Sequence, residues 1–162
     1  MAKNKEEKTN VMRVLEQKKI AYTPHSYPHE EGIAVDGVTV AQSMGFDPAI
    51  VFKTLVARGA SKQYYVFDVP VAANLDLKKA AKAVGEKSIE MIHQKELLPL
   101  TGYVHGGCSP VGMKKLFPTV FHSSAENLAA MIVSAGKIGY QVELAPRDLA
   151  ALVRAKFADI IA

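Results

Sequence analysis

A single lysine lies in the middle of the most apolar strand-like segment of the chain. Lys53 stands within Ile50-Val51-Phe52-Lys53-Thr54-Leu55-Val56-Ala57, and side chains of a strand alternate between its two faces. Both faces of this segment are apolar, which is typical of a strand buried on both sides. An unpaired ammonium there costs several kcal/mol or loses its charge. We therefore expect Lys53 to project into a wet, concave site and meet an anion; a lysine that snorkels from a strand end is the alternative.

The bulk composition indicates one globular domain. The chain has 162 residues, is 49% hydrophobic, and contains no apolar run of the roughly 20 residues needed to span a bilayer. The N-terminal segment, Met1–Lys8, is charged and has no apolar core behind it, so we do not expect a signal peptide. The one cysteine, Cys108, allows no internal disulfide and fits a reducing compartment. We expect a cytoplasmic protein that has no membrane contact.

The charge balance permits a nucleic-acid partner. The formal net charge is +4 and the pI is near 9.1. Residues 76–85 predict a helix closed by glycine, with two lysines four residues apart on one face. This lysine-bearing face could contact phosphates or could be an ordinary solvated helix face, and the sequence supports both interpretations. The lysines that could form a phosphate-facing surface are Lys78, Lys82, Lys87, Lys95, Lys114 and Lys115.

Hydrophobic periodicity and capping residues predict a mixed α/β domain in which helices interrupt short strands of a central sheet. The expected helices cover residues 9–19, 38–44, 76–85, 94–98 and 147–154, the fourth cut off by Pro99. The expected strands cover residues 21–26, 50–57, 63–69, 88–91, 119–122, 130–134, 140–144 and 157–161. The strands at 50–57 and 63–69 should pair as a hairpin.

Two glycine-rich segments are candidates for ligand contact. In Gly106–Gly112, three glycines and a proline allow a ligand to approach main-chain N–H groups, which could hold a carbonyl or a developing oxyanion. A tight structural turn is the alternative. Ser134–Gly139 follows an apolar strand, and it lacks the spacing of a phosphate-binding P-loop.

Thiol and metal chemistry receive little support from the sequence. Cys108 has glycine neighbours and His105 three residues earlier, but no carboxylate that could orient the pair stands nearby. A lone cysteine is more often a small buried hydrophobe. Cys108, His105 and His122 offer no fourth zinc ligand at a recognisable spacing, so we expect no metal.

Five segments together resemble the YbaK family, and the similarity extends from about Val11 to Ile160. Each motif alone is weak, but their combination and order are specific. The segments are Phe52–Leu55, Asn74–Ala81, Gly106–Lys115, Ser134–Gly139 and Val142–Leu149. The resemblance departs from the family pattern at Asp36, where relatives carry an aromatic residue before the glycine, and at Cys108, which is commonly aliphatic.

The resemblance implies a single domain, residues 1–162, built on a barrel-like mixed sheet surrounded by helices. Members of this family are free-standing relatives of the editing domain inserted in bacterial prolyl-tRNA synthetases. The implied activity is trans-editing, the hydrolysis of the ester between a wrong amino acid, mainly cysteine, and tRNA(Pro). The resemblance also implies that no cofactor is used and that prolyl-tRNA synthetase is a partner. We expect a monomer because no apolar surface helix is evident.

The same resemblance assigns roles to residues of this chain. Lys53 corresponds to the conserved lysine of the family and would hold a phosphate or polarise the site. Amides of Gly106 and Gly107 would bind the ester carbonyl oxygen and complete the expected catalytic set. The expected substrate-binding residues are Tyr27, Thr54, Ser134 and Gly136.

Three alternatives stay open at this point. The chain could bind tRNA or a synthetase without hydrolysis, it could prefer alanine to cysteine, or it could use Cys108 as a nucleophile. The attacking group in the main hypothesis is water or the thiol of the substrate itself, so that the protein mostly positions the reactants.

Overall fold

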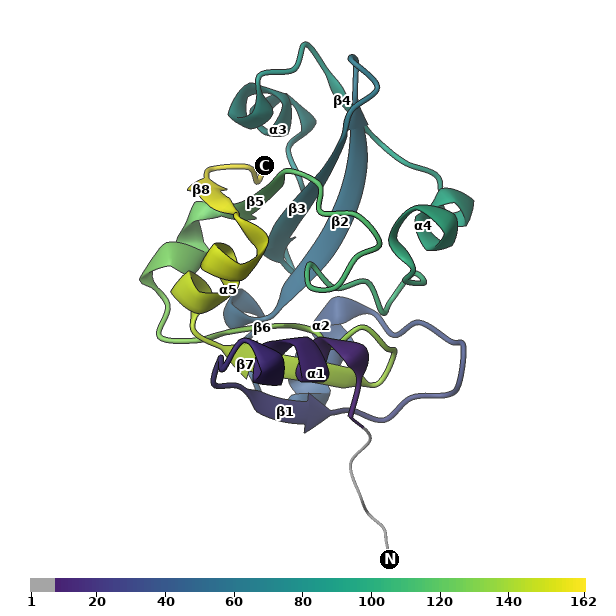
Figure 1. Cartoon of the computed structure of the whole chain (residues 1–162), viewed down its shortest axis with the longest axis vertical. Helices are drawn as coiled ribbons and strands as arrows, with labels where there is room; N and C mark the ends of the chain where they lie inside the picture. The colour runs from purple at the N-terminus through teal and green to yellow at the C-terminus, as the bar shows by residue number, and fades with distance from the viewer. Residues whose placement is uncertain (1–7) are drawn as a thin grey trace, which may run out of the picture.

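Two β-sheets joined by a single bridge form the framework of the protein, as the computed structural model shows for residues 8–162 (Figure 1). The smaller sheet is antiparallel, in the order β1 (Thr23–Ser26), β7 (Tyr140–Leu144) and β6 (Met131–Ser134). The larger sheet is mixed and has the order β4-β2-β3-β5-β8. Its strands are β2 (Phe52–Gly59), β3 (Tyr64–Pro70), β4 (Ile89–Met91), β5 (Thr119–His122) and β8 (Lys156–Ala158).

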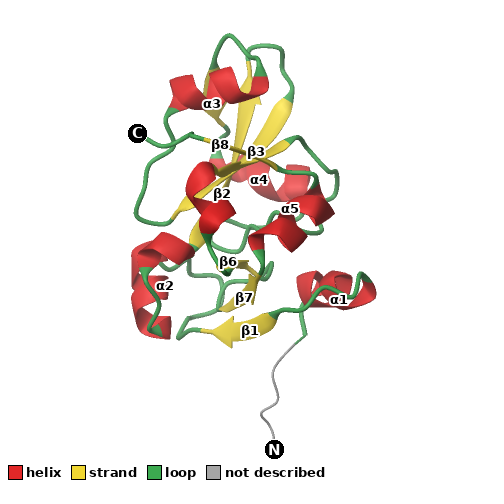
Figure 2. Cartoon of the chain, turned by 90° about the vertical axis from the view of Figure 1, so that its left-hand side faces the viewer, coloured by secondary structure: helices red, strands yellow, loops and turns green. Residues whose placement is uncertain are grey.

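Helices cover both sheets. Figure 2 shows α1 and α2 on opposite sides of the three-stranded sheet and α3 at the far end of the molecule. Local signals explain the helix ends: the Thr9 hydroxyl accepts from the Met12 amide at 3.2 Å, and Gly45 ends α2 in the left-handed conformation. The helices are α1 (Asn10–Gln17), α2 (Gly37–Met44), α3 (Leu77–Val84), α4 (Gln94–Thr101) and α5 (Pro146–Val153), with 3-10 turns η1 (Pro48–Ile50) and η2 (Ser123–Asn127).

Three apolar clusters hold these elements together. The largest contains Leu15 of α1, Phe121 of β5 and Leu149 of α5, all fully buried. A second cluster lies under α3, and a third packs α2 against Val51 and Ile132. Burial of this kind contributes roughly 25 cal/mol per Å² of apolar surface. The third cluster surrounds the bridge between the two sheets.

The predicted mixed α/β class and the predicted hairpin are confirmed. β2 and β3 pair antiparallel from Phe52↔Pro70 to Arg58↔Tyr64. A barrel-like sheet is not confirmed, because Val51↔Ile132 is the one bridge that joins the two sheets within residues 8–162. The edge strands of the larger sheet, β4 and β8, have three residues each and do not pair with each other.

The prediction that Pro99 ends its helix is wrong, because α4 continues to Thr101. Pro99 has no amide hydrogen, so the Lys95 carbonyl loses its partner within the helix. Lys95 is exposed, and water can hydrogen-bond this carbonyl instead. The last turn is held by other bonds: the Thr101 hydroxyl donates to Leu97 O at 2.8 Å, and Gly102 N donates to Leu98 O at 2.8 Å. These contacts outweigh the loss.

The expectation that the N-terminal segment is not a signal peptide concerns Met1–Lys8. Residues 1–7 of this segment lie outside the described residues. Among the helices of residues 8–162, none has the length and apolar character required to cross a bilayer.

Candidate functional site

A cavity of about 340 Å³ opens at the seam between the two sheets. Its walls come from β2, from α2 with the loop before it, from the loop after α4, and from facing residues of β6 and β7. A cavity of this size lies in the range of small-molecule sites. Five of the seven predicted site residues line it: Tyr27, Lys53, Thr54, Gly106 and Ser134.

The short length of β4 explains why the cavity forms beside β2. β4 pairs only with Ala57–Gly59, so the outer edge of β2 is not covered by β4 at Phe52–Leu55. Side chains from both faces of the strand reach the cavity there. Lys53, Thr54 and Leu55 are accordingly half-buried. The expectation that the segment 50–57 is buried on both faces holds for Val51, Phe52, Val56 and Ala57.

The Lys53 ammonium has no hydrogen-bond or ion-pair partner among residues 8–162. Burial lowers the pKa of Lys53, and the nearby Asp36 carboxylate opposes that shift. Asp36 also lines the cavity and caps α2, since its carboxylate accepts from the Thr39 amide at 3.1 Å. Asp36 thus places a negative charge near Lys53. The unpartnered ammonium is suited to receive an anion.

Thr54 is bound from behind by a carboxylate that the sequence reasoning missed. Its hydroxyl donates to Asp68 Oδ1 at 2.5 Å, across the β2–β3 pair. Asp68 has no exposed surface, and its second oxygen has no hydrogen-bond partner among the described residues. Burial raises the pKa of Asp68 to about 7, and the Thr54 hydrogen bond counteracts part of that shift. A buried acid therefore adjoins the cavity.

Ser134 enters the cavity from the smaller sheet, and Gly136 holds it there. The Gly136 amide donates to Ser134 Oγ at 3.0 Å, which leaves the serine O–H to donate elsewhere. Gly136 does not line the cavity; it has φ +92°, and a Cβ there would lie 2.9 Å from Tyr103 Cε1. The structure thus places Gly136 behind the predicted site rather than inside it.

The two adjacent glycines of the 106–112 loop occupy different environments. Gly106 lines the cavity with φ +90°, and a Cβ there would lie 2.7 Å from Ala34 Cβ. Gly107 does not line the cavity, and its amide donates to Val104 O at 2.9 Å. Its backbone packs against Lys137 and Ile138. Of this pair, only Gly106 is brought to the cavity.

Cys108 lines the cavity as a buried thiol and not as an activated one. Burial raises the pKa of Cys108 to about 12, with a further contribution from the Asp68 carboxylate. A thiol of this kind is not ionised at neutral pH, and the thiolate is the nucleophilic form. Tyr27 is also buried, which raises its pKa, and a hydrogen bond with the Gly139 backbone opposes that rise.

One further polar side chain of the cavity was not found from the sequence. Gln141 of β7 pairs with Ser134 of β6, is 7% exposed, and has an Oε1 atom without a partner among residues 8–162. His105, which the sequence analysis considered beside Cys108, lines the same cavity. Within the described part of the chain, no group of three or more His, Cys, Asp and Glu side chains is arranged to hold a metal ion.

Comparison with known proteins agrees with this geometry. Residues 34–152 match the family described as the aminoacyl-tRNA editing domain. A protein of Enterococcus faecalis, EbsC, named as a candidate Cys-tRNA(Pro)/Cys-tRNA(Cys) deacylase, is 46% identical over 99% of this chain and 98% of its own length.

Solved structures show the same fold. The crystal structure of a candidate trans-editing enzyme for prolyl-tRNA synthetase has a TM-score of 0.79 and 25% identity, and the match covers 94% of each chain. A hypothetical protein, APE2540, has a TM-score of 0.82 at 19% identity, over 94% of this chain and 99% of the other, which shows the fold alone. The matched region and the resemblance between the sequences agree, and the chain belongs to the aminoacyl-tRNA editing domain family, of the YbaK type.

Proposed function

We propose that this protein is an aminoacyl-tRNA deacylase that hydrolyses mischarged tRNA in trans, with Cys-tRNA(Pro) as its main substrate. The observation that carries the proposal is the unpartnered ammonium of Lys53 in the cavity of a family member. The name of the 46% identical relative supports cysteine as the amino acid. The whole chain, residues 1–162, would act as one editing domain, as a monomer in the cytoplasm beside prolyl-tRNA synthetase.

Each predicted site residue receives a role that its position permits. Lys53 binds the phosphate of the terminal nucleotide or stabilises charge at the ester, and Gly106 allows the ester carbonyl to approach the loop backbone. Ser134 and Thr54 hydrogen-bond the aminoacyl or ribose part of the substrate, and Tyr27 forms part of the cavity wall. Gly107 and Gly136 act indirectly, because they shape the loops that carry Gly106 and Ser134.

The reaction needs no protein nucleophile. Water, or the thiol of the substrate cysteine, attacks the ester carbonyl carbon; the bond to the ribose oxygen breaks, and that oxygen takes a proton. With water the products are free tRNA and the amino acid. An aminoacyl ester is already reactive, so orientation inside the cavity can supply much of the rate increase. The raised pKa of Cys108 supports this mechanism against the thiol-dependent alternative.

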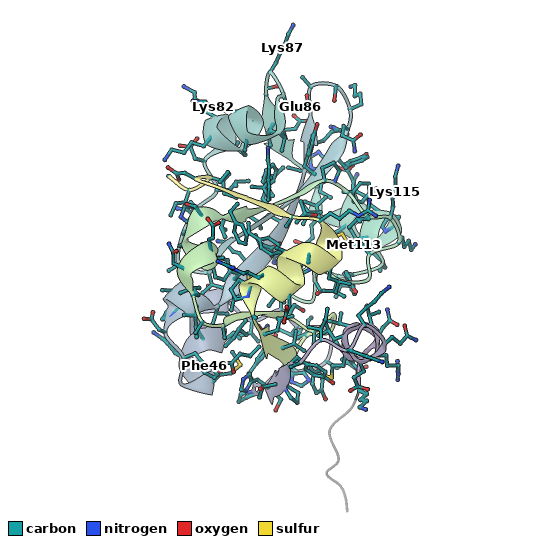
Figure 3. The ribbon with its side chains drawn as sticks, turned by 60° about the vertical axis from the view of Figure 1, so that its left-hand side comes forward. Phe46, Lys82, Glu86, Lys87, Met113 and Lys115 are labelled. Atoms are coloured by element: carbon teal, nitrogen blue, oxygen red, sulfur yellow. The ribbon has the colours of Figure 1, made fainter. Side chains whose placement is uncertain are left out.

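The first experiment is deacylation of Cys-tRNA(Pro) and Ala-tRNA(Pro) by the wild type, Lys53→Ala and Lys18→Ala. Lys18 is a matched control, since it is exposed, does not line the cavity and is not one of the candidate phosphate-facing lysines. Lys82 points outward from α3 (Figure 3) but is one of those candidates, and it is therefore not used as the control. We expect Lys53→Ala to lose roughly a hundredfold or more in rate, as for removal of an electrostatic contact, while Lys18→Ala keeps its activity.

The outcomes separate the competing functions. Hydrolysis of Cys-tRNA(Pro) by the wild type, together with a loss of this activity in Lys53→Ala, supports the proposal. Activity on the alanyl ester alone would keep the chemistry and change the substrate. Binding of tRNA without hydrolysis of either ester would support a non-catalytic binding module instead.

A further inference from the structure

A hydroxyl of the cavity is bound to a fully buried carboxylate. Thr54 and Asp68 stand directly opposite each other on β2 and β3, and the Thr54 hydroxyl donates to Asp68 Oδ1 at 2.5 Å. They lie on the strand face that also carries Phe52 and Val66, both members of the main core. A carboxylate in such surroundings requires a compensating interaction, and its second oxygen has none among residues 8–162.

This arrangement makes the Thr54 oxygen an acceptor on its cavity side. A threonine hydroxyl has one hydrogen, and here that hydrogen is directed to Asp68, so only lone pairs remain for a ligand. A hydrogen bond to a carboxylate is stronger than one between neutral groups, and it polarises the hydroxyl oxygen further. The oxygen is therefore complementary to a ligand group that donates, and best to one that carries positive charge.

A second acceptor, Gln141 Oε1, comes from a residue that lines the same cavity. Gln141 Oε1 and Asp68 Oδ2 are the buried side-chain atoms that lack a partner in the part of the chain described by the structure. Gln141 comes from β7, in the smaller sheet, while Thr54 comes from β2, in the larger one. A small group with several N–H donors, such as an ammonium, matches acceptors on two walls better than a hydroxyl with one hydrogen does.

We propose that Thr54 receives the α-ammonium group of the aminoacyl ester and that Asp68 is the positioning residue that fixes the Thr54 hydroxyl for this contact. This inference rests on the proposed function, since it names which part of that substrate lies against β2. The side chains of Lys53 and Thr54 project from opposite faces of β2. The Lys53 ammonium is therefore separated from the acceptor oxygens of Thr54 and Gln141. The ester then has its phosphate end at Lys53 and its amino end at Thr54.

The state of the buried acid is consistent with a cationic ligand. Burial raises the pKa of Asp68 to about 7, which makes its charge sensitive to a nearby ion. Within residues 8–162 no cation is paired with Asp68, and its hydrogen-bond partner is the neutral Thr54 hydroxyl. A bound ammonium would hold the carboxyl in its ionised form.

The test compares two esters that differ only in the ammonium group. Cysteinyl-tRNA(Pro) and 3-mercaptopropionyl-tRNA(Pro) carry the same thiol, and the second has hydrogen in place of the amino group. Their ratio of kcat/KM is measured for the wild type, Thr54→Val, Thr54→Ser and Asp68→Leu. The intrinsic reactivities of the two esters cancel when ratios are compared between enzymes, so the change in ratio reports recognition by the protein.

We expect Thr54→Val to lower this ratio by roughly tenfold to a hundredfold, the value of a hydrogen bond to a charged group. Thr54→Ser should keep the preference, because it restores the hydroxyl, and Asp68→Leu should lose it. In the double variant Thr54→Val/Asp68→Leu the ratio should fall no further, since both changes remove one contact. A ratio that is unchanged in Thr54→Val overturns the inference, and the Val and Ser variants decide it even if Asp68→Leu fails to fold.

A binding measurement separates this inference from the proposed function. Non-hydrolysable 3′-amide analogues of adenosine, one with cysteine and one with 3-mercaptopropionate, are titrated into the wild type and Thr54→Val by calorimetry. A preference of the wild type for the cysteine analogue that Thr54→Val loses supports the ammonium site, whether or not the esters are cleaved. Cleavage of both esters without such a preference overturns the ammonium site and leaves the deacylase function intact.

Discussion

Replacing Asp68 by asparagine should make the protein more stable at pH 8 than at pH 5, relative to the wild type. Asp68 is fully buried, and burial raises its pKa from the ordinary 3.8 to about 7. The folded state therefore holds the proton more tightly than the unfolded state. The stability linked to this group is complete below about pH 4 and is lost as the pH rises through about 7. The asparagine side chain of the variant cannot ionise, so the variant carries no such loss.

The magnitude follows from the two pKa values. Each unit of difference corresponds to about 1.4 kcal/mol, so the carboxyl lowers the stability of the wild type by about 4 kcal/mol at pH 8. At pH 5 the same linkage gives only about 1.7 kcal/mol. Asparagine keeps the acceptor for Thr54, but its NH2 group replaces Oδ2 and lacks a partner, which costs about 1–3 kcal/mol at both pH values. The difference between variant and wild type should thus shift by about 2.5 kcal/mol in favour of Asp68→Asn between pH 5 and pH 8.

The assay is urea unfolding of the wild type, Asp68→Asn and Glu31→Gln at both pH values, with two-state behaviour checked by two probes. Glu31→Gln is the control, because it removes a carboxyl that is exposed and not part of the buried core. If the difference between Asp68→Asn and the wild type is the same at pH 5 and pH 8, Asp68 ionises like an ordinary carboxyl, and its assignment as a buried acid is refuted.

Three further substitutions have distinct expected outcomes. Lys53→Met should abolish deacylation while the melting temperature at pH 7 stays equal or rises, because burial lowers the pKa of this lysine and so opposes its charge; a clear drop would indicate a structural ion pair. Gly106→Ala should lose about 1–3 kcal/mol in urea unfolding, since it combines φ +90° with a 2.7 Å approach to Ala34, and wild-type stability would contradict this. Cys108→Ala should deacylate about as fast as the wild type and lose about 1 kcal/mol of stability from a small cavity, whereas inactivity in a folded variant would restore the thiol mechanism.

Periodicity and capping residues were sufficient for most of the elements, because those signals are local. Thr9 and Gly45 mark helix ends through bonds to their own neighbours, and the structure shows both. Closure of the sheet was not predictable in this way, because it depends on how strands distant in sequence pair. The bridge between Val51 and Ile132 joins residues whose separation no local pattern encodes.

In the candidate site, too, features encoded locally were predictable and features that depend on three-dimensional contacts were not. A lysine in an apolar strand led to the cavity, and the same physical reason, applied to the Asp68 position in the next predicted strand, would have found the buried acid. Glycine motifs were less informative, because a glycine can admit a ligand or allow two backbones to pack. Only three-dimensional contacts distinguish Gly106, which lines the cavity, from Gly107 and Gly136, which pack behind it.

Because the cavity lies where a single bridge joins the two sheets, a bound ligand would link one sheet to the other. Acceptors on β2 and β7 belong to different sheets, so one ligand held by both would add a link between two parts that the Val51–Ile132 bridge and the main apolar core already join. Such a ligand stabilises the folded state by mass action and slows separation of the sheets. The amides of β6 and β7 should then exchange their hydrogens more slowly in the presence of the cysteine analogue. A tRNA that carries the wrong amino acid would thus stabilise the folded structure of the protein that hydrolyses it.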